Sequence, residues 1–87
     1  MIVGFTCGTF DLVHAGHVLM LKEASEVCDF LIVGLHIDPS EEREWKNKPV
    51  QSIHERFIQL EAIKYVDYVL PYHTEHDMHE LLQILRV

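Results

Sequence analysis

The sequence predicts an α/β fold in which helices cover both faces of a parallel sheet. Two continuous apolar runs, residues 1–7 and 30–35, are typical of strands that are buried on both faces. Between them lies an amphipathic segment, residues 15–27, of the length expected for a crossover helix. A second amphipathic segment, residues 52–65, precedes a short apolar stretch at 67–70. Strands that alternate with helical segments in this way predict a three-layer α/β/α arrangement.

The order of the elements also predicts the topology of the sheet. A last amphipathic segment, residues 74–87, completes the order β-α-β-α-β-α. Right-handed crossovers then favour strands that lie side by side in the order 3-2-1, which is one half of a doubly wound sheet. We expect Pro71 to stop the third strand, because proline has no backbone N–H for the ladder.

Local signals mark the starts of the later helices. Ser52 is followed three residues later by Glu55, and this capping box predicts a helix start. The stretch from Thr74 to Asp77 is a weaker signal of the same kind. Residues 40–51 are charged and lack apolar periodicity, so we expect a long loop that covers a functional site.

Composition limits the classes of protein to which the chain can belong. It has 87 residues, of which 48% are hydrophobic, and this is enough for one packed core. The formal net charge of −7 argues against a protein that binds nucleic acid or an acidic membrane, since such proteins present basic patches. Any phosphate ligand must therefore be held by local geometry.

The cysteines and the apolar runs point to a cellular compartment. Cys7 and Cys28 lack CxxC spacing, which indicates reduced thiols that pack in the core. No apolar run approaches the roughly 20 residues of a membrane span. The start of the chain also lacks a basic segment followed by a cleavable apolar stretch. We expect a soluble, cytoplasmic protein.

Residues 8–17, Gly-Thr-Phe-Asp-Leu-Val-His-Ala-Gly-His, connect the first strand to the first helix. In an open α/β sheet such a turn lies at the carboxyl end of a strand, where ligands bind and free N–H groups attract anions. His14 and His17 are three residues apart and should lie on one face of the first helical turn. These features predict a phosphate-binding site.

This stretch resembles the HxGH signature of the nucleotidyltransferase superfamily, and the longer pattern GTFDLxHxGH resembles its cytidylyltransferase branch. Residues 64–69, Lys-Tyr-Val-Asp-Tyr-Val, are similar to the RYVDEV segment of that branch, at matching spacing. The resemblance covers nearly the whole chain and implies a Rossmann-like nucleotidyltransferase fold. The family has a further strand and a helix that opens with an ISTT-type motif, and neither has a counterpart here. We therefore expect a single domain, residues 1–87, that is incomplete at its C-terminus.

The resemblance also implies a reaction. CMP moves from CTP to a phosphorylated alcohol such as glycerol 3-phosphate, pyrophosphate is released, and Mg²⁺ bridges the triphosphate oxygens. One alternative is an adenylyltransferase that uses ATP and a sugar phosphate, since HAGH also occurs in such enzymes. Another is a non-catalytic half-domain that binds a nucleotide or dimerises. Residues 64–67 resemble a dimer surface of the family, which implies a homodimer.

Roles for the motif residues follow from the same resemblance. The family's histidines contact the nucleotide phosphates, so His14 and His17 are expected to be catalytic; the alternative is that they only cap the helix. Thr9 and Phe10 are expected to donate backbone N–H groups to phosphates, although the ring of Phe10 suits the core equally well. Asp11 is expected to cap the helix start, or to orient the acceptor or a metal.

Four residues outside the motif complete the expected site. In related cytidylyltransferases a lysine of the long loop reaches the phosphates, which implies a catalytic Lys46 and a nucleotide-binding Lys48. Arg56 matches a family arginine and is expected to contact the acceptor phosphate, or else to form a surface ion pair with a glutamate. Asp38 follows the second strand and suits the acceptor, a cation or a local cap equally well.

The glycines of the motif and the remaining histidines carry weaker expectations. Gly8 is expected to let the backbone approach the nucleotide, and Gly16 to leave space for its ribose or base, with a plain turn role as the alternative. His73, His76 and His79 recur at every third position, but only two of them share a helix face. We therefore expect no metal site among them.

Overall fold

The computed structural model describes residues 1–85, and its helices and strands alternate in the predicted order. The elements are β1 (Val3–Gly8), α1 (Ala15–Glu26), β2 (Phe30–His36), the 3₁₀ turn η1 (Pro39–Glu41), α2 (Ile53–Glu61), β3 (Tyr68–Tyr72) and α3 (Glu75–Leu85). Within these residues no helix is both long enough and apolar enough to cross a membrane.

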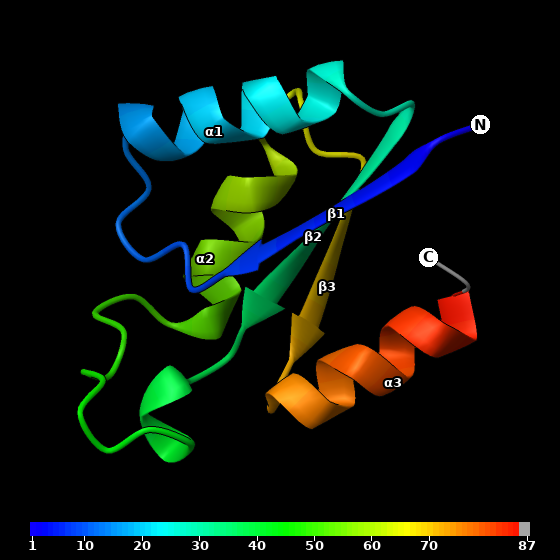
Figure 1. Ribbon diagram of the computed structural model, residues 1–87. Helices are drawn as coiled ribbons and strands as arrows, with labels where there is room; N and C mark the ends of the chain where they lie inside the picture. Colours follow the sequence, from blue (N-terminus) through cyan, green and yellow to red (C-terminus); the bar gives the residue numbers. More distant parts are fainter. Residues whose placement is uncertain (86–87) are drawn as a thin grey trace.

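The three strands form one parallel sheet in the order β1-β2-β3, as predicted (Figure 1). Val3 pairs with Phe30 at the start of the first ladder, and Ile32 pairs with Tyr68 in the second. Because all three arrows point the same way, the carboxyl ends of the strands share one edge. The start of α1 and the turn η1 lie at this edge.

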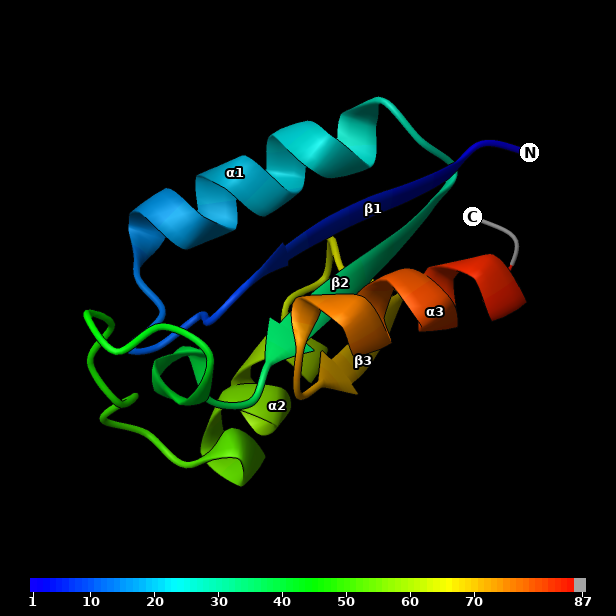
Figure 2. The same ribbon diagram turned by 60° about the horizontal axis from the view of Figure 1, so that its bottom comes forward.

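Helices α1 and α2 cover one face of the sheet and α3 covers the other (Figures 1 and 2). Leu21 of α1 and Leu60 of α2 have no exposed surface and belong to one core with alternate residues of β2, namely Leu31, Val33 and Leu35. The intervening residues of β2 face α3, where the ring of His36 stacks on that of Tyr72. The predicted three-layer, Rossmann-like fold is therefore confirmed.

The third strand is longer than predicted. Pro71 does not stop β3 but pairs with Leu35 in the ladder, and the strand continues to Tyr72. This prediction was wrong because β3 is an edge strand in the three-stranded sheet, and an edge strand tolerates proline. The side chain of Pro71 is accordingly exposed.

The second helix is shorter than predicted. It ends at Glu61, with Ala62 as its C-cap, instead of continuing to residue 65. Ile63 and Val66 donate N–H groups to the carbonyls of Leu60 and Ile63, so the chain leaves the helix through tight turns. Apolar periodicity persists past the helix end because these turn residues also pack against the core. The last helix starts at Glu75, and the predicted positions 86 and 87 lie outside the described residues.

Candidate active site

The turn between β1 and α1 has an unusual backbone. Phe10 and Leu12 have φ angles of 49° and 52°, in the left-handed region that non-glycine residues rarely adopt. Each such residue costs about 1–3 kcal/mol, so the surrounding contacts must hold the turn in place. The ring of Phe10 is buried in the core, which confirms the structural alternative for its side chain.

The rings of His14 and His17 both accept backbone N–H groups at the start of α1. The Nδ1 atom of His14 accepts the N–H of Gly16 at 3.0 Å, and the Nδ1 atom of His17 accepts the N–H of His14 at 3.1 Å. The two imidazoles therefore form a reciprocal capping box, a role usually filled by serine and glutamate. Their ring centroids lie 4.1 Å apart at an interplanar angle of 40°. Asp11, which we expected as a possible cap, does not cap the helix.

This arrangement fixes the tautomer of both rings. A neutral imidazole that accepts a hydrogen bond at Nδ1 carries its proton on Nε2. Within residues 1–85 the hydrogen bonds of these two rings use Nδ1, which leaves the Nε2–H group of each ring available. His14 is exposed and His17 is half-buried. Burial, and then the neighbouring His14, lower the pKa of His17 below its ordinary value, which keeps this ring neutral at pH 7.

The two motif glycines make room for aromatic rings of the motif, Gly16 for that of His14 and Gly8 for that of Phe10. A Cβ atom at Gly16 would lie 2.8 Å from Cε1 of His14, so a side chain there would push the ring out of its capping position. A Cβ atom at Gly8 would lie 3.2 Å from the ring of Phe10. The roles expected for both glycines next to a nucleotide stay predictions.

Arg56 joins the carboxyl ends of two strands. Its side chain donates to the carbonyls of Thr9 and His36 at 3.0 and 2.7 Å, and to those of Ile37 and Gln51 at 2.5 and 3.2 Å. Only 2% of the residue is exposed. Burial lowers the pKa of the guanidinium, and the charges of two nearby aspartates oppose that shift.

These contacts give Arg56 a positioning role. Its partners are backbone carbonyls, and the surface ion pair that we considered is absent from the part of the chain that the structure describes. The expected contact with an acceptor phosphate stays a prediction. A positive charge in the first turn of a helix interacts unfavourably with the helix dipole. This unfavourable position was the signal in the sequence that Arg56 has tertiary partners.

Asp11 holds the far end of the long loop instead of a helix. Its carboxylate accepts the N–H groups of Val50 and Gln51 at 2.7 and 2.9 Å. The bond from Gln51, followed by that from Val50, lowers the pKa of Asp11. The side-chain oxygen of Gln51 in turn accepts the N–H of Leu12 at 2.8 Å. No sequence motif marks Gln51, and our sequence reasoning missed it.

The near end of the loop is fastened to α3. The carboxylate of Glu42 accepts the N–H of Glu75 at 3.0 Å and lies 3.4 Å from Nε2 of His36. Arg43 forms an ion pair with the side chain of Glu75. Both ends of the loop are thus attached, and the exposed segment between them, residues 44–48, carries Lys46 and Lys48.

Three of the predicted site residues line one cavity of about 230 Å³ between the loop and the start of α2: Asp38, Lys48 and Arg56. Asp38 caps η1, since its Oδ1 accepts the N–H and the hydroxyl of Ser40 at 3.0 and 2.6 Å. The hydroxyl of Ser40 is the largest influence that lowers the pKa of Asp38, and the charge of Lys48 contributes. Lys46 is exposed on the same loop, and its approach to a ligand stays a prediction.

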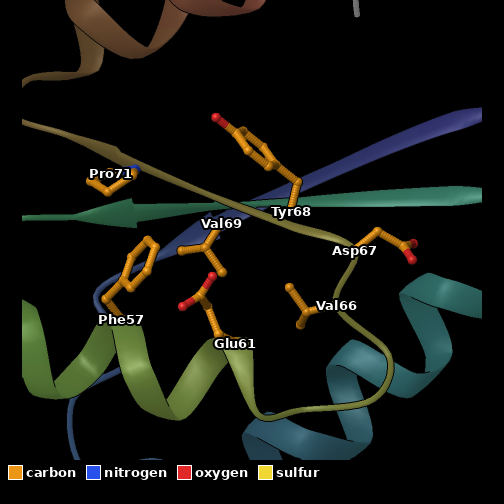
Figure 3. A pocket seen from close by; sticks show the side chains of 7 residues that line it. All are labelled: Phe57, Glu61, Val66, Asp67, Tyr68, Val69 and Pro71. Carbon is orange, nitrogen blue, oxygen red and sulfur yellow. The ribbon is translucent and has the colours of Figure 1, made fainter.

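Two other features lie apart from these residues. Among residues 1–85, no three histidine, cysteine, aspartate or glutamate side chains gather as a metal-binding group. A separate cavity of about 270 Å³ lies between α2 and β3 (Figure 3). There Val69 points toward α2, Tyr68 points to the opposite side of the strand, and Phe57 and Glu61 come from the helix. None of the predicted site residues lines this cavity.

Comparison with known proteins decides the family. The profile of the family described as Cytidylyltransferase-like matches residues 5–86, which include the histidine pair and all of the sheet except the first two residues of β1. The chain belongs to the cytidylyltransferase-like family. The resemblance inferred from residues 8–17 and 64–69 is therefore confirmed.

The chain is similar to several longer members of this family. It is 44% identical to the ethanolamine-phosphate cytidylyltransferase of Arabidopsis thaliana over 64 residues. The match covers 72% of this chain and 15% of that protein. It is also 41% identical to the bifunctional protein HldE of a Bradyrhizobium species, in a match that covers 97% of this chain and 17% of that protein. The lipopolysaccharide core biosynthesis protein of Thermoplasma volcanium has the same fold, with a TM-score of 0.84, 29% identity, and coverage of 99% of this chain and 69% of that one.

The contacts of Arg56 predict a large loss of stability when its side chain is replaced. R56M would leave four buried or partly buried carbonyls without donors, and we expect the free energy of unfolding to fall by about 3 kcal/mol or more. R56K keeps the charge but cannot reach all four acceptors, so its loss should be intermediate. Urea denaturation measures both.

Arg43 provides the matched control for this prediction. It forms an ion pair with Glu75 in which the two side chains are 41% and 46% exposed. R43M should therefore lower the free energy of unfolding by less than about 1 kcal/mol. Equal losses in R56M and R43M would contradict the positioning role of Arg56.

The lowered pKa of His17 predicts a pH dependence of stability. Since the folded protein binds this proton less tightly than the unfolded chain, stability should fall as the pH drops below about 6.5. H17Q should remove this part of the slope, because glutamine at this position can still accept the N–H of His14 but does not titrate. Melting temperatures at about pH 7.5 and 5.5 test this, and an equal drop in both proteins would argue against it.

Proposed function

We propose that the chain transfers CMP from CTP to the phosphate of a phosphorylated alcohol, with release of pyrophosphate. The observation that carries this proposal is the histidine pair, whose Nδ1 atoms are held by backbone N–H groups and whose Nε2–H groups are free to meet an anion. The names of relatives support the donor and the acceptor class, because three of them are named ethanolamine-phosphate cytidylyltransferases, one of these as probable. Ethanolamine phosphate and glycerol 3-phosphate are both phosphorylated alcohols.

The reaction requires placement more than covalent chemistry. A phosphate oxygen of the acceptor attacks the α-phosphorus of CTP, and a new P–O bond forms as the bond to the pyrophosphate oxygen breaks. The acceptor oxygen is already anionic, so no general base is needed. Charge builds up on the equatorial oxygens of the α-phosphorus, and donors that are oriented beforehand stabilise it. His14 and His17 supply two such donors at the positive end of α1.

The other residues of the site fit binding roles. The backbone N–H groups of Thr9 and Phe10 lie in the turn before the histidines and suit the triphosphate. Lys48 and Asp38 line the cavity beside the loop, where an acceptor with a phosphate group and a polar head can be held. Lys46, on the exposed part of the same loop, is long enough to add a positive charge as the nucleotide binds.

Mg²⁺ fits this site as a companion of the nucleotide. Both oxygens of Asp11 already accept backbone N–H groups, and Oδ1 of Asp38 is occupied by Ser40. The residues present therefore suit an ion held mainly by triphosphate oxygens and water, with a free oxygen of Asp38 as the available protein ligand. When bound, Mg²⁺ would neutralise the charge that accumulates on the leaving pyrophosphate.

We also propose a homodimer in the cytoplasm. Residues 64–67 form the turn before β3, and the cavity shown in Figure 3 is lined by Val66, Asp67 and the half-exposed Tyr68. A second copy of the chain would cover this apolar hollow at the edge of the sheet.

A pyrophosphate-release assay tests the proposed activity. CTP with ethanolamine phosphate or glycerol 3-phosphate should support turnover, and ATP with a sugar phosphate is the rival combination. Turnover only with ATP would move the chain to the adenylyltransferase alternative. If calorimetry detects binding of CTP or ATP in the presence of Mg²⁺ without turnover, the nucleotide-binding form of the non-catalytic alternative holds, and if it detects no binding, the dimerising form holds.

The histidine donors give a sharper prediction. H14N keeps a cap acceptor and H17Q keeps the N3 acceptor, while each variant removes one imidazole N–H. We expect kcat/KM to fall by about 10²–10³ in each variant with the fold intact. H14A should show the same kinetic loss and also lose about 1 kcal/mol of stability, because it removes the cap.

His79 offers the matched control. It is exposed on α3, outside the site, so H79Q should keep the activity of the unmodified chain. If H14N and H17Q are as active as H79Q, the histidine pair does not carry the reaction.

A further inference from the structure

Gln51 ties the end of the long loop to the motif turn through two groups and to Arg56 of α2 through a third. Its side-chain oxygen accepts the N–H of Leu12 at 2.8 Å, and its own N–H donates to Asp11 at 2.9 Å. Its carbonyl accepts from Nε of Arg56 at 3.2 Å. We call the contacts between the loop end and the motif turn the latch. In the latch the carboxylate of Asp11 accepts the N–H groups of Val50 and Gln51, and the side chain of Gln51 accepts the N–H of Leu12.

The latch lies where the backbone is strained. Leu12 has a φ of 52°, yet 54% of the residue is exposed, so packing of its side chain does little to hold that conformation. A leucine in the left-handed region returns to the right-handed one unless something else holds it. The polar contacts in the structure that do so are the bond from the N–H of Leu12 to Gln51 and the two bonds to its neighbour Asp11.

We propose that Gln51 is a positioning residue, which holds Leu12 in its left-handed conformation and so fixes the orientation of the histidine pair. This inference rests on the proposed function. Leu12 is two residues before His14, whose N–H and side chain form the capping box. A rotation at Leu12 changes the direction in which the chain enters α1, and the imidazole donors move with it.

The latch also couples the histidines to the lysines. Residues 44–48 are exposed between two anchors, and the second anchor is the pair formed by Asp11 and Gln51. When the latch is closed, the end of the loop nearest Lys48 has a fixed distance from the motif turn. Glutamine suits this position because its amide oxygen accepts a hydrogen bond without adding a second negative charge beside Asp11.

The test replaces Gln51 by methionine, which has a similar length but no strong acceptor. We expect Q51M to speed hydrogen exchange at the Leu12 amide by tenfold or more and to lower kcat by about tenfold, because small displacements of catalytic groups are costly. KM for CTP should change less than threefold, since Thr9 and Phe10, whose backbone N–H groups we expect to bind the triphosphate, precede the residue that rotates. Q59M is the matched control, because Gln59 is exposed on α2, and both readouts should stay within twofold of the unmodified chain.

A second substitution separates positioning from general damage. Glycine adopts positive φ without strain, so adding L12G to Q51M should restore most of the lost kcat although the hydrogen bond is still missing. Loss of activity in Q51M with no recovery in the double variant would contradict action through Leu12. Unchanged amide exchange and unchanged kcat in Q51M would overturn the inference entirely.

The two readouts also separate this inference from the proposed function. If the unmodified chain neither binds nor turns over a nucleotide, the proposed function fails. Amide exchange at Leu12, together with the imidazole chemical shifts of His14 and His17, then decides on its own whether Gln51 holds the turn and the pair. Shifts that move in Q51M and not in Q59M support the inference, and shifts that stay in place contradict it.

Discussion

At the carboxyl edge of the sheet, side chains form hydrogen bonds with the backbone N–H and C=O groups that the strands and helices leave unpaired. Arg56 donates to carbonyls from the ends of β1 and β2 and from the loop before α2. On the donor side, imidazole, carboxylate and amide groups accept the N–H groups of the motif turn and of the loop end. Buried backbone groups must be paired, and here that requirement brings together two segments about forty residues apart in the chain.

In the histidine pair, both residues use the same ring nitrogen to accept a backbone N–H group at the helix start. Each ring uses Nδ1 for the backbone, and this leaves Nε2–H as the group that can meet a ligand. Capping and phosphate binding are therefore not competing explanations for His14 and His17. Gly16 belongs to the same arrangement, because any side chain there would collide with the ring of His14.

Most of the fold could be predicted from apolar periodicity, because strands buried on both faces and amphipathic helices have distinct patterns. The errors occurred where tertiary context decides: Pro71 is tolerated at an edge, and Ile63 is apolar because a turn packs on the core. In the site, the motif located the histidines. It could not reveal that Asp11 bonds to Val50 and Gln51, because hydrogen bonds across about forty residues leave no local signal. The buried state of Arg56 was hidden for the same reason.

The central claim is that the backbone fixes both imidazoles with the proton on Nε2. Long-range nitrogen NMR of the histidine rings at about pH 7.5 tests it most directly, with the exposed His79 as an internal reference. The account predicts that His14 and His17 are Nε2–H tautomers and that their Nε2 resonances move when CTP and Mg²⁺ are added. Protons found on Nδ1, or rings that respond to the nucleotide no more than His79 does, would contradict it.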